Sequence, residues 1–419
     1  MAMPSVHYQN SQPMKRFFSI SIFVLSLSLL ISCEEKSDPA LDAATFTKIY
    51  SNNQFSTAFY PLSIKQTNDE GYLILAEKKL YDTTARYTYL LKVDKFGNVI
   101  KDTEADLDKT FTNPVPNLIQ IDNNYYFFFM IGTGTYLAKT DAELSKIDTV
   151  GLDGLTYPAA ASFDQYDNTN SKFTLLNYDY DNRQFLLSVV DVTGQVSNTK
   201  RFDIETTNEI EGPIIDHFNH TGKEFPFLAG RLANGTYYFN AFVNYSFSLI
   251  FTDLSNDNSI LGRVDGQRNY GGINSVIQLS GDNFAAAKFN FGSNYFLPKM
   301  TVSTTASKSI TDYDGNPIPE LVADSKVKTI QANANAKSII LFAGNTRSNQ
   351  IGLYAYDATT GLFIGSRYLG FSNPFEVADI IQTKDGGIAV CGTTFTAGRF
   401  SRICIFKLSK SELNKFTKS

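Results

Sequence analysis

Short apolar runs bounded by turn residues recur along most of the chain and predict β-strands. The clearest copies are IKQTNDEGYLILAEKK (64–79) with YLLKVDKFGNVIKDT (89–103), and IIQTKDGGIAVCGTT (380–394) with ICIFKLSKSELNK (403–415). Both copies give a strand, an Asp-Gly turn, a strand, a loop, a strand and a turn opened by Asp or Ser. No long stretch has apolar residues at three- and four-residue spacing, so helices are expected to be rare.

Two landmarks give the period of this repeat, which is about 50 residues. A Gln closes the opening strand at Gln66, Gln120, Gln278, Gln331 and Gln382. An Asp or Ser opens the late turn at Asp94, Asp141, Asp191, Asp253, Asp357 and Ser409. The gap of 158 residues between Gln120 and Gln278 spans three periods, and the gap of 104 between Asp253 and Asp357 spans two, so both series count seven units. The units between about 157 and 320 are degenerate.

Such a unit with three or four short strands is typical of a propeller blade. We therefore expect an all-β fold, a seven-bladed β-propeller with four-stranded blades. A pair of β-sandwiches imposes no regular period, and the turns of a parallel β-helix are much shorter.

The two ends of the repeat region indicate how the ring closes. The last unit stops after its third strand, SRICIFKL (401–408), while TFTKIY (45–50) resembles the closing strands NTKRFDI (198–204) and IGSRYLG (364–370). We predict that 45–50 supplies the outer strand of the seventh blade, which removes an exposed sheet edge.

The first 33 residues have the pattern of a lipoprotein signal. Lys15-Arg16 precede an apolar run of 16 residues (17–32), whereas a membrane span needs about 20. The run ends in Leu30-Ile31-Ser32-Cys33, a lipoprotein cleavage box. The expected organisation is a signal peptide (1–32), a linker lipidated on Cys33 (33–44) and a propeller (45–419), with the hypothesis that 1–13 is an over-extended start.

The charge of the chain argues against two classes of partner. Residues 1–32 hold two basic and no acidic residues, so the formal net charge of −5 becomes −7 after their removal. A mildly acidic chain without a basic cluster is not expected to bind nucleic acid or a polybasic-dependent membrane surface.

Cys391 and Cys404 are the remaining cysteines, and they flank the predicted hairpin turn TAGR (396–399). An even hairpin places them directly opposite each other, at a separation near that of a disulfide. An envelope compartment permits oxidation. The alternative is two small apolar side chains packed between blades.

Candidate metal ligands are few, and we expect no metal site. Asp216, His217 and His220 lie in PIIDHFNHTGKE (213–224), which lacks a zinc spacing and is expected to be a solvated loop. The Asp-rich segments NYDYDNR (177–183) and TDYDGNPIP (311–319) are weak calcium candidates that turn chemistry explains well. The expected cofactor list is empty apart from the covalent lipid on Cys33.

Two ligand or enzyme hypotheses remain open beside these. Tyrosines in NYYFFFM (124–130), NGTYYFNAFVNYSF (234–247) and FGSNYF (291–296) are candidates for stacking on sugars, although the chain has no Trp. A carboxylate pair of the glycosidase type, or a lyase site, is not visible in sequence because such a site is defined in space. With two histidines after Cys33, a Ser-His-Asp catalyst is not expected.

The DGGY-type turn followed by YLLKVDKFGN resembles the repeat of seven-bladed propeller lipoproteins common in Bacteroidota, over most of 61–415. The resemblance implies that Glu34-Glu35 after Cys33 form an export signal to the exterior face of the outer membrane. It also implies O-glycosylation at Thr83 and Thr149, within Asp82-Thr83-Thr84 and Asp148-Thr149-Val150.

From these patterns we expect a surface lipoprotein that acts as a non-enzymatic binding or scaffold subunit. Its partners are expected to be outer-membrane proteins of a transport, secretion or membrane-protein insertion complex, because propeller loops form wide, rigid faces. The alternative is a surface glycan-binding protein, and a glycosidase or lyase with its site in the funnel comes third. Fold likeness alone decides none of these.

Overall fold

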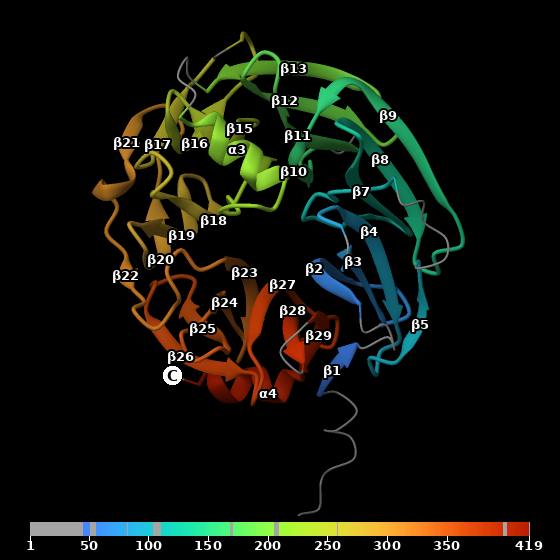
Figure 1. The fold of residues 1–419 in the computed structure, drawn as a ribbon. Helices are drawn as coiled ribbons and strands as arrows, with labels where there is room; N and C mark the ends of the chain where they lie inside the picture. Colours follow the sequence, from blue (N-terminus) through green and yellow to red (C-terminus); the bar gives the residue numbers. More distant parts are fainter. Residues whose placement is uncertain are drawn as a thin grey trace, which may run out of the picture. The chain divides into compact units, whose positions relative to one another are not determined.

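The computed structural model describes residues 45–50, 56–81, 83–103, 110–167, 171–204, 209–257, 259–396 and 400–418. They form seven antiparallel sheets arranged as the blades of a ring, so the predicted seven-bladed β-propeller is confirmed (Figure 1). Cys33, Glu34 and Glu35 lie outside the described residues, and the predictions that rest on them stay predictions. No helix in the described ranges is long and apolar enough to cross a membrane.

The first three blades are regular four-stranded sheets. Blade 1 is β2 (Thr57–Gln66), β3 (Tyr72–Leu80), β4 (Arg86–Val93) and β5 (Val99–Asp102). Blade 2 is β6 (Ile119–Ile121), β7 (Asn124–Ile131), β8 (Gly134–Asp141) and β9 (Ile147–Thr156). Blade 3 is β10 (Pro158–Phe163), β11 (Lys172–Asp179), β12 (Gln184–Asp191) and β13 (Val196–Asp203).

The next two blades depart from the pattern, which accounts for part of the degenerate span of 157–320; blade 3, in the same span, is regular. Blade 4 is β14 (Leu228–Arg231), β15 (Tyr237–Val243), β16 (Ser246–Thr252) and β17 (Gly262–Asp265). Blade 5 is β18 (Gly271–Ser280), β19 (Asn283–Asn290), β20 (Ser293–Thr301) and the two-residue β22 (Asn316–Pro317). Between β20 and β22 the chain adds β21 (Ser307–Ser309) parallel to β17 of blade 4, then the 3-10 turn η1 (Ile310–Asp312).

The last two blades return to the regular pattern. Blade 6 is β23 (Val327–Ala334), β24 (Lys337–Asn345), β25 (Ile351–Asp357) and β26 (Phe363–Leu369). Blade 7 is β27 (Phe375–Gln382), β28 (Ile388–Thr396) and β29 (Phe400–Leu408), completed by β1 (Phe46–Tyr50).

The predicted closure by residues 45–50 is confirmed. Strand β1 pairs antiparallel with β29 from Phe46 opposite Lys407 to Tyr50 opposite Ile403. The Thr45 hydroxyl also accepts a hydrogen bond from the Ser409 backbone N–H at 3.1 Å. The two ends of the propeller therefore share one sheet, and β29 has no open edge.

The Asp and Gly residues of the turn between the first and second strands have a structural role in blades 1 and 7. Asp69 accepts from the Gly71 N–H at 3.2 Å and binds the buried Lys92 ammonium at 2.8 Å. Asp385 repeats this in blade 7 with the Gly387 N–H and Lys407. At Gly71 an added Cβ would collide with the Val93 carbonyl oxygen, so the turn requires glycine.

The repeated Gln residues connect adjacent blades. The Gln66 side-chain oxygen accepts from the Lys384 N–H, that of Gln278 from Ala233, and that of Gln382 from Asn333. The late Asp residues cap their own turns, as Asp94 does for Phe96 and Asn98. Several of the residues that repeat in the sequence therefore make equivalent hydrogen bonds in different blades.

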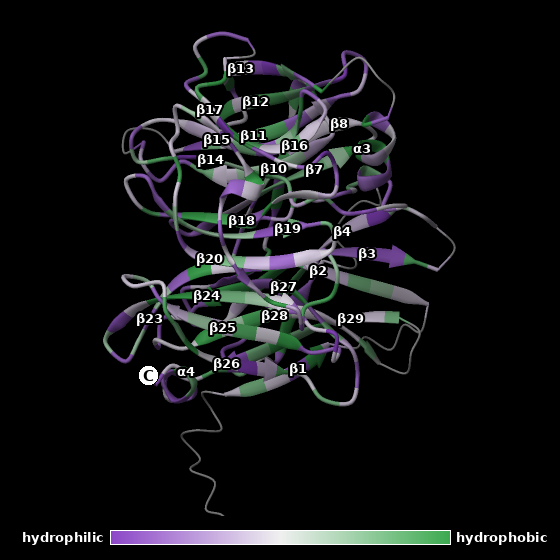
Figure 2. Ribbon diagram, turned by 90° about the vertical axis from the view of Figure 1, so that its left-hand side faces the viewer, coloured by the Kyte–Doolittle hydropathy of each residue, from purple (hydrophilic) through white to green (hydrophobic). Residues whose placement is uncertain are grey.

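The hydrophobic core lies between neighbouring blades. Phe296 of blade 5 stacks on Phe342 of blade 6 with ring centroids 4.3 Å apart, and similar aromatic contacts recur around the ring. Figure 2 shows hydrophobic stretches concentrated on the strands and hydrophilic stretches in many of the loops.

The predicted disulfide between Cys391 and Cys404 is wrong, and both are buried free thiols. Cys391 is opposite Ile405, whereas Cys404 is opposite Gly392, so the hairpin register is one residue off the even register that we expected. Successive strand positions face opposite sides of a sheet. Cys391 therefore packs between blades 7 and 1, and Cys404 between blades 6 and 7.

The expectation of a loop over 213–224 is wrong for its first half. Helix α3 (Glu211–Phe218) lies between blades 3 and 4, and α4 (Lys410–Phe416) follows β29. Ile210, Ile214 and Phe218 are buried at a spacing of four residues, which gives α3 one apolar face. The eight residues of α3 are too short a stretch for an apolar spacing of three and four residues to stand out in the sequence.

Candidate functional site

Helix α3 marks one face of the ring, which we call the α3 face. The connections between blades and the loops between second and third strands all emerge here, because successive strands run in opposite directions. In Figure 1 α3 is seen over the inner part of the ring rather than at its periphery. The segment from α3 to residue 225 therefore borders the entrance to the centre of the ring.

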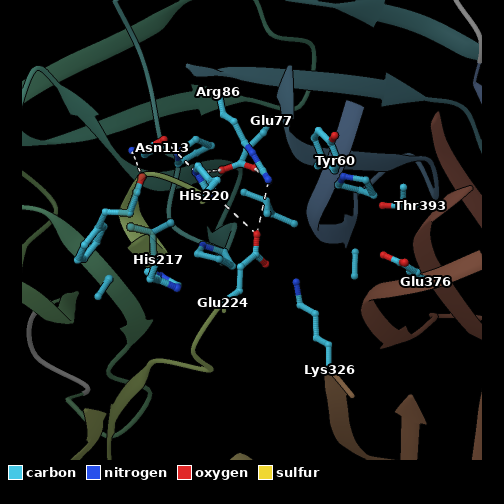
Figure 3. A pocket seen from close by; sticks show the side chains of 18 of the residues that line it. Tyr60, Glu77, Arg86, Asn113, His217, His220, Glu224, Lys326, Glu376 and Thr393 are labelled. Atoms are coloured by element: carbon cyan, nitrogen blue, oxygen red, sulfur yellow. Dashed lines mark hydrogen bonds and ion pairs between the residues drawn. The ribbon is translucent and has the colours of Figure 1, made fainter. Parts of the chain in front are cut away.

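A cavity of about 360 Å³ opens beneath this segment, and we call it the funnel. Its lining combines blades 1, 3, 6 and 7 with α3, the segment that follows α3 and the connection between blades 1 and 2. The polar residues in the lining are Asn345 and the ten that Figure 3 labels: Tyr60, Glu77, Arg86, Asn113, His217, His220, Glu224, Lys326, Glu376 and Thr393.

Arg86 is the cation at the centre of the funnel wall. Its Nη1 lies 2.7 Å from Glu77 Oε2 and 3.6 Å from Glu224 Oε1, and its guanidinium stacks 4.4 Å from the Tyr60 ring centroid. The Glu77 side chain is 3% exposed. Because a buried carboxylate requires compensation, the Arg86–Glu77 pair is the fixed element of the site.

His220 connects the α3 segment to blade 1. Its Nε2 lies 3.2 Å from Asn113 Oδ1 and 3.5 Å from Glu77 Oε1, while its Nδ1 lies 3.6 Å from Glu224 Oε1. The close approach of His220 is the largest influence that holds the pKa of Glu224 well below its usual range; Lys326 and Arg86 add to it. These contacts hold the segment after α3 across the mouth of the funnel.

His217 faces a different environment. Its Nδ1 accepts a hydrogen bond from the Phe225 N–H at 3.0 Å, and its ring meets Phe227 edge-on at 4.8 Å. Burial lowers the pKa of His217 to about 4. The imidazole is therefore neutral near pH 7, with its proton on Nε2.

The structure does not bring Asp216, His217 and His220 together as metal ligands. Asp216 accepts from the Thr221 hydroxyl at 3.0 Å, and the two histidines have the partners given above. Within the described ranges, no group of three or more His, Cys, Asp or Glu residues is arranged to hold a metal ion. In the two calcium candidates, Asp179 caps the turn at Asn182 and Asp312 caps η1.

Two charged residues of the funnel have no ion-pair partner within the described part of the chain. These are Lys326 before β23 and Glu376 on β27; in Figure 3 the Lys326 side chain points toward Glu224, and Glu376 lies on the opposite side of the pocket. Burial raises the pKa of Glu376. Glu77 and Glu224 instead both contact Arg86 and His220. Both carboxylates therefore hold the segment after α3 at the mouth of the funnel.

Exposed aromatic side chains gather on the α3 face outside the funnel. Tyr270 and Phe291, 50% and 68% exposed, stack with ring centroids 5.8 Å apart and an interplanar angle of 11°. Tyr81 meets Phe400 edge-on at 6.3 Å, and Arg268 lies over Tyr245 at 4.9 Å. Further exposed rings in loops of this face are Tyr180 and Phe371.

The tyrosines that we expected to stack on sugars are buried or only partly exposed. Residues 124–130 fall in β7, where Tyr125 and Tyr126 are buried, and residues 234–247 contribute only partly exposed rings. Phe291 is the exposed ring of the third segment. Of the O-glycosylation candidates, Thr149 is exposed on β9 and Thr83 half-buried in the β3–β4 loop, and their modification stays a prediction.

Sequence reasoning missed Glu77, Arg86, Glu224 and Glu376. Glu77 and Arg86 flank the β3–β4 hairpin, and opposite charges across a hairpin were the one available signal. Nothing in the sequence joins either residue to position 224 or 376, because the ring brings them together.

Comparison with known proteins places the chain in no family. No protein-family model matches it, and no curated protein matches its sequence. Among solved structures it is similar to the Dos1 propeller, at 11% identity and a TM-score of 0.46, over 86% of this chain and 81% of that one. At this identity the likeness concerns the fold alone.

Two other solved structures are similar at the same level. Drosophila Semaphorin 2a matches at 10% identity and a TM-score of 0.48, over 85% of this chain and 75% of that one. The β-propeller domain of the Trilobed protease from Pyrococcus furiosus matches at 9% identity and a TM-score of 0.43, over 84% and 94%.

Proposed function

We propose that this chain is a non-enzymatic binding protein that docks a protein partner on its α3 face. In the full proposal, lipid on Cys33 anchors the propeller to the outer membrane. Glu34-Glu35 direct it to the exterior, and the partner is a subunit of an outer-membrane complex.

The observation that carries the proposal is the set of exposed aromatic rings on the α3 face. Tyr270 and Phe291 are exposed, and Arg268, in the same connection as Tyr270, lies over the half-buried Tyr245. Protein interfaces are enriched in aromatic residues and Arg. Tyr81, Tyr180, Tyr270, Phe291 and Phe371 come from five separate loops and connections between blades. Exposed apolar groups of this kind mark interaction sites in soluble domains.

The frame that holds these rings supports the same proposal. Gln66, Gln278 and Gln382 join neighbouring blades, and β1 closes the ring. A surface whose loops are held in place loses little conformational entropy when a partner binds. The funnel carboxylates Glu77 and Glu224 are engaged by Arg86 and His220, so the proposal assigns them a structural role.

The test is co-purification of the tagged chain from membranes of cells that make it. In the double variant Tyr270→Ala/Phe291→Ala we expect the stable partner to fall by at least about tenfold, since aromatic hot spots contribute about 2 kcal/mol or more. The matched control is Phe96→Ala/Leu362→Ala, which removes exposed apolar side chains from loops of the opposite face.

Equal recovery of the partner by both double variants would contradict the proposal. Binding of the purified chain to a glycan array, lost in Tyr270→Ala/Phe291→Ala and without any protein partner, would replace it with the glycan-binding alternative.

A further inference from the structure

A second cavity, of about 570 Å³, is lined by residues further along the inner strands than those of the funnel, toward the face opposite α3, and we call it the inner chamber. It shares Val115, Pro116 and Ala159 with the funnel, so the two are continuous. Inner strands of six blades contribute to its wall: β2, β10, β14, β18, β23 and β27.

Two lysines enter the inner chamber without compensation. Lys65 on β2 and Lys328 on β23 line it, and Lys326 lines the funnel just above. Within the described part of the chain, the ammonium groups of these three lysines have neither an ion-pair nor a hydrogen-bond partner. By contrast, the buried Lys92 and Lys407 elsewhere in the ring are each paired with a turn Asp.

The Asp379 carboxylate lines the same chamber but forms no ion pair with these lysines, so one negative charge faces two positive ones. Asp379 accepts hydrogen bonds from the Ser63 hydroxyl at 2.9 Å and the Ile64 N–H at 3.0 Å. It therefore serves the contact between blades 7 and 1. Burial lowers the pKa of Lys328 to about 8; Asp379 opposes this shift, and Lys326 and Lys65 reinforce it.

A hydroxyl in the same wall also lacks a partner. Ser162 Oγ, on β10, is buried and makes no hydrogen bond, although it lines the chamber. The amides of Gln331 and Gln382 are already engaged, with Ser338 and with the Asn333 backbone. The chamber therefore has two ammonium groups that are able to donate to an oxyanion, and one buried hydroxyl without a partner in its wall.

We propose that the inner chamber binds a small ligand through an oxyanion group, a carboxylate, phosphate or sulfate, held by Lys65 and Lys328. Uncompensated charges in a cavity destabilise the free protein, and a bound anion compensates them. The volume suits a ligand of monosaccharide or organic-acid size. This site is separate from the proposed docking of a partner on the α3 face.

The test is titration calorimetry of the purified chain with four probes: inorganic phosphate, sulfate, galacturonate and the uncharged sugar galactose. We expect saturable binding of at least one anion and none of galactose. Comparison of the affinities for the four probes shows whether the chamber prefers an inorganic oxyanion or an acidic sugar. Lys65→Met and Lys328→Met should each weaken anion binding at least about tenfold, because each removes one charged hydrogen bond.

Two further results distinguish this site from unspecific charge attraction. Both Met variants should raise the melting temperature of the ligand-free protein, by roughly 2–4 °C, because they remove an unpaired charge. The control Lys146→Met, on an exposed loop, should leave anion binding unchanged. Anion affinity should also fall as the pH rises through about 8, as Lys328 loses its proton.

The proposal is overturned if no anion binds, or if Lys65→Met and Lys328→Met bind anions as tightly as the parent chain. Lower melting temperatures in both variants would likewise contradict it, because the lysines would then stabilise the free fold.

Discussion

Arg86 is the side chain on which the buried charges of the funnel wall depend. It compensates Glu77, whose side chain is almost fully buried, and it also approaches Glu224. Loss of the guanidinium leaves a buried carboxylate alone, whereas loss of both charges leaves only a change of shape.

We therefore expect Arg86→Ala to lower the free energy of unfolding by about 3–5 kcal/mol. Glu77→Gln/Arg86→Met should recover most of that loss. Urea unfolding followed by circular dichroism measures both. A single variant as stable as the parent chain would show that the pair contributes nothing.

His217 makes stability depend on pH at the same mouth. Its pKa is about 4 in the folded chain and about 6.5 as a model value, so the unfolded state takes up the proton first as the pH falls. Stability should decrease between pH 6.5 and pH 4, by on the order of 2 kcal/mol once partial solvent exposure is considered.

The measurement is the melting temperature against pH for the parent chain and for His217→Asn. The Asn amide oxygen can still accept from the Phe225 N–H but does not titrate in this range. The variant should therefore have a flatter profile between pH 4 and 6.5. Parallel profiles for the two proteins would assign the pH dependence to other groups.

At the scale of elements, β1 is the strand whose removal should matter most. It contributes five residue pairs to blade 7 through β29, and its Phe46 ring lies against Gly97 of blade 1. A chain that starts at residue 45 should melt like one that starts at residue 33.

A chain that starts at residue 51 should lose blade 7 cooperatively and melt at least about 5 °C lower, because β29 then has an open edge. Differential scanning calorimetry of the three chains decides this. Equal melting temperatures for the starts at 45 and 51 would contradict the role of β1 in closure.

The sequence predicted strands and blades well because turn chemistry repeats with the fold. Asp69 and Asp385 each bind a glycine N–H and a lysine of their own blade. Gln66, Gln278 and Gln382 each accept a hydrogen bond from a backbone N–H of the preceding blade. Register and short helices were predicted poorly. One extra residue in a hairpin separates Cys391 from Cys404, and α3 is helical because its apolar face is buried.

At the scale of the whole molecule, the ring builds its sites from residues far apart in sequence. The funnel combines positions 77, 86, 220, 224, 326 and 376, and the inner chamber combines 65, 162 and 328. No local spacing encodes such sets, so only the closed ring reveals them. Tyr81, Tyr180, Tyr270, Phe291 and Phe371 are also far apart in sequence, and the alternation of strand direction places these five rings on one face.

The central claim is that the α3 face carries the partner, and photo-cross-linking in intact cells tests it most directly. A photoreactive amino acid replaces Phe291 on the α3 face or, in a matched chain, Leu362 on the opposite face; both native side chains are 68% exposed. We predict a single major cross-linked product from position 291 and none from position 362. Cross-linking from position 362 alone would contradict the claim.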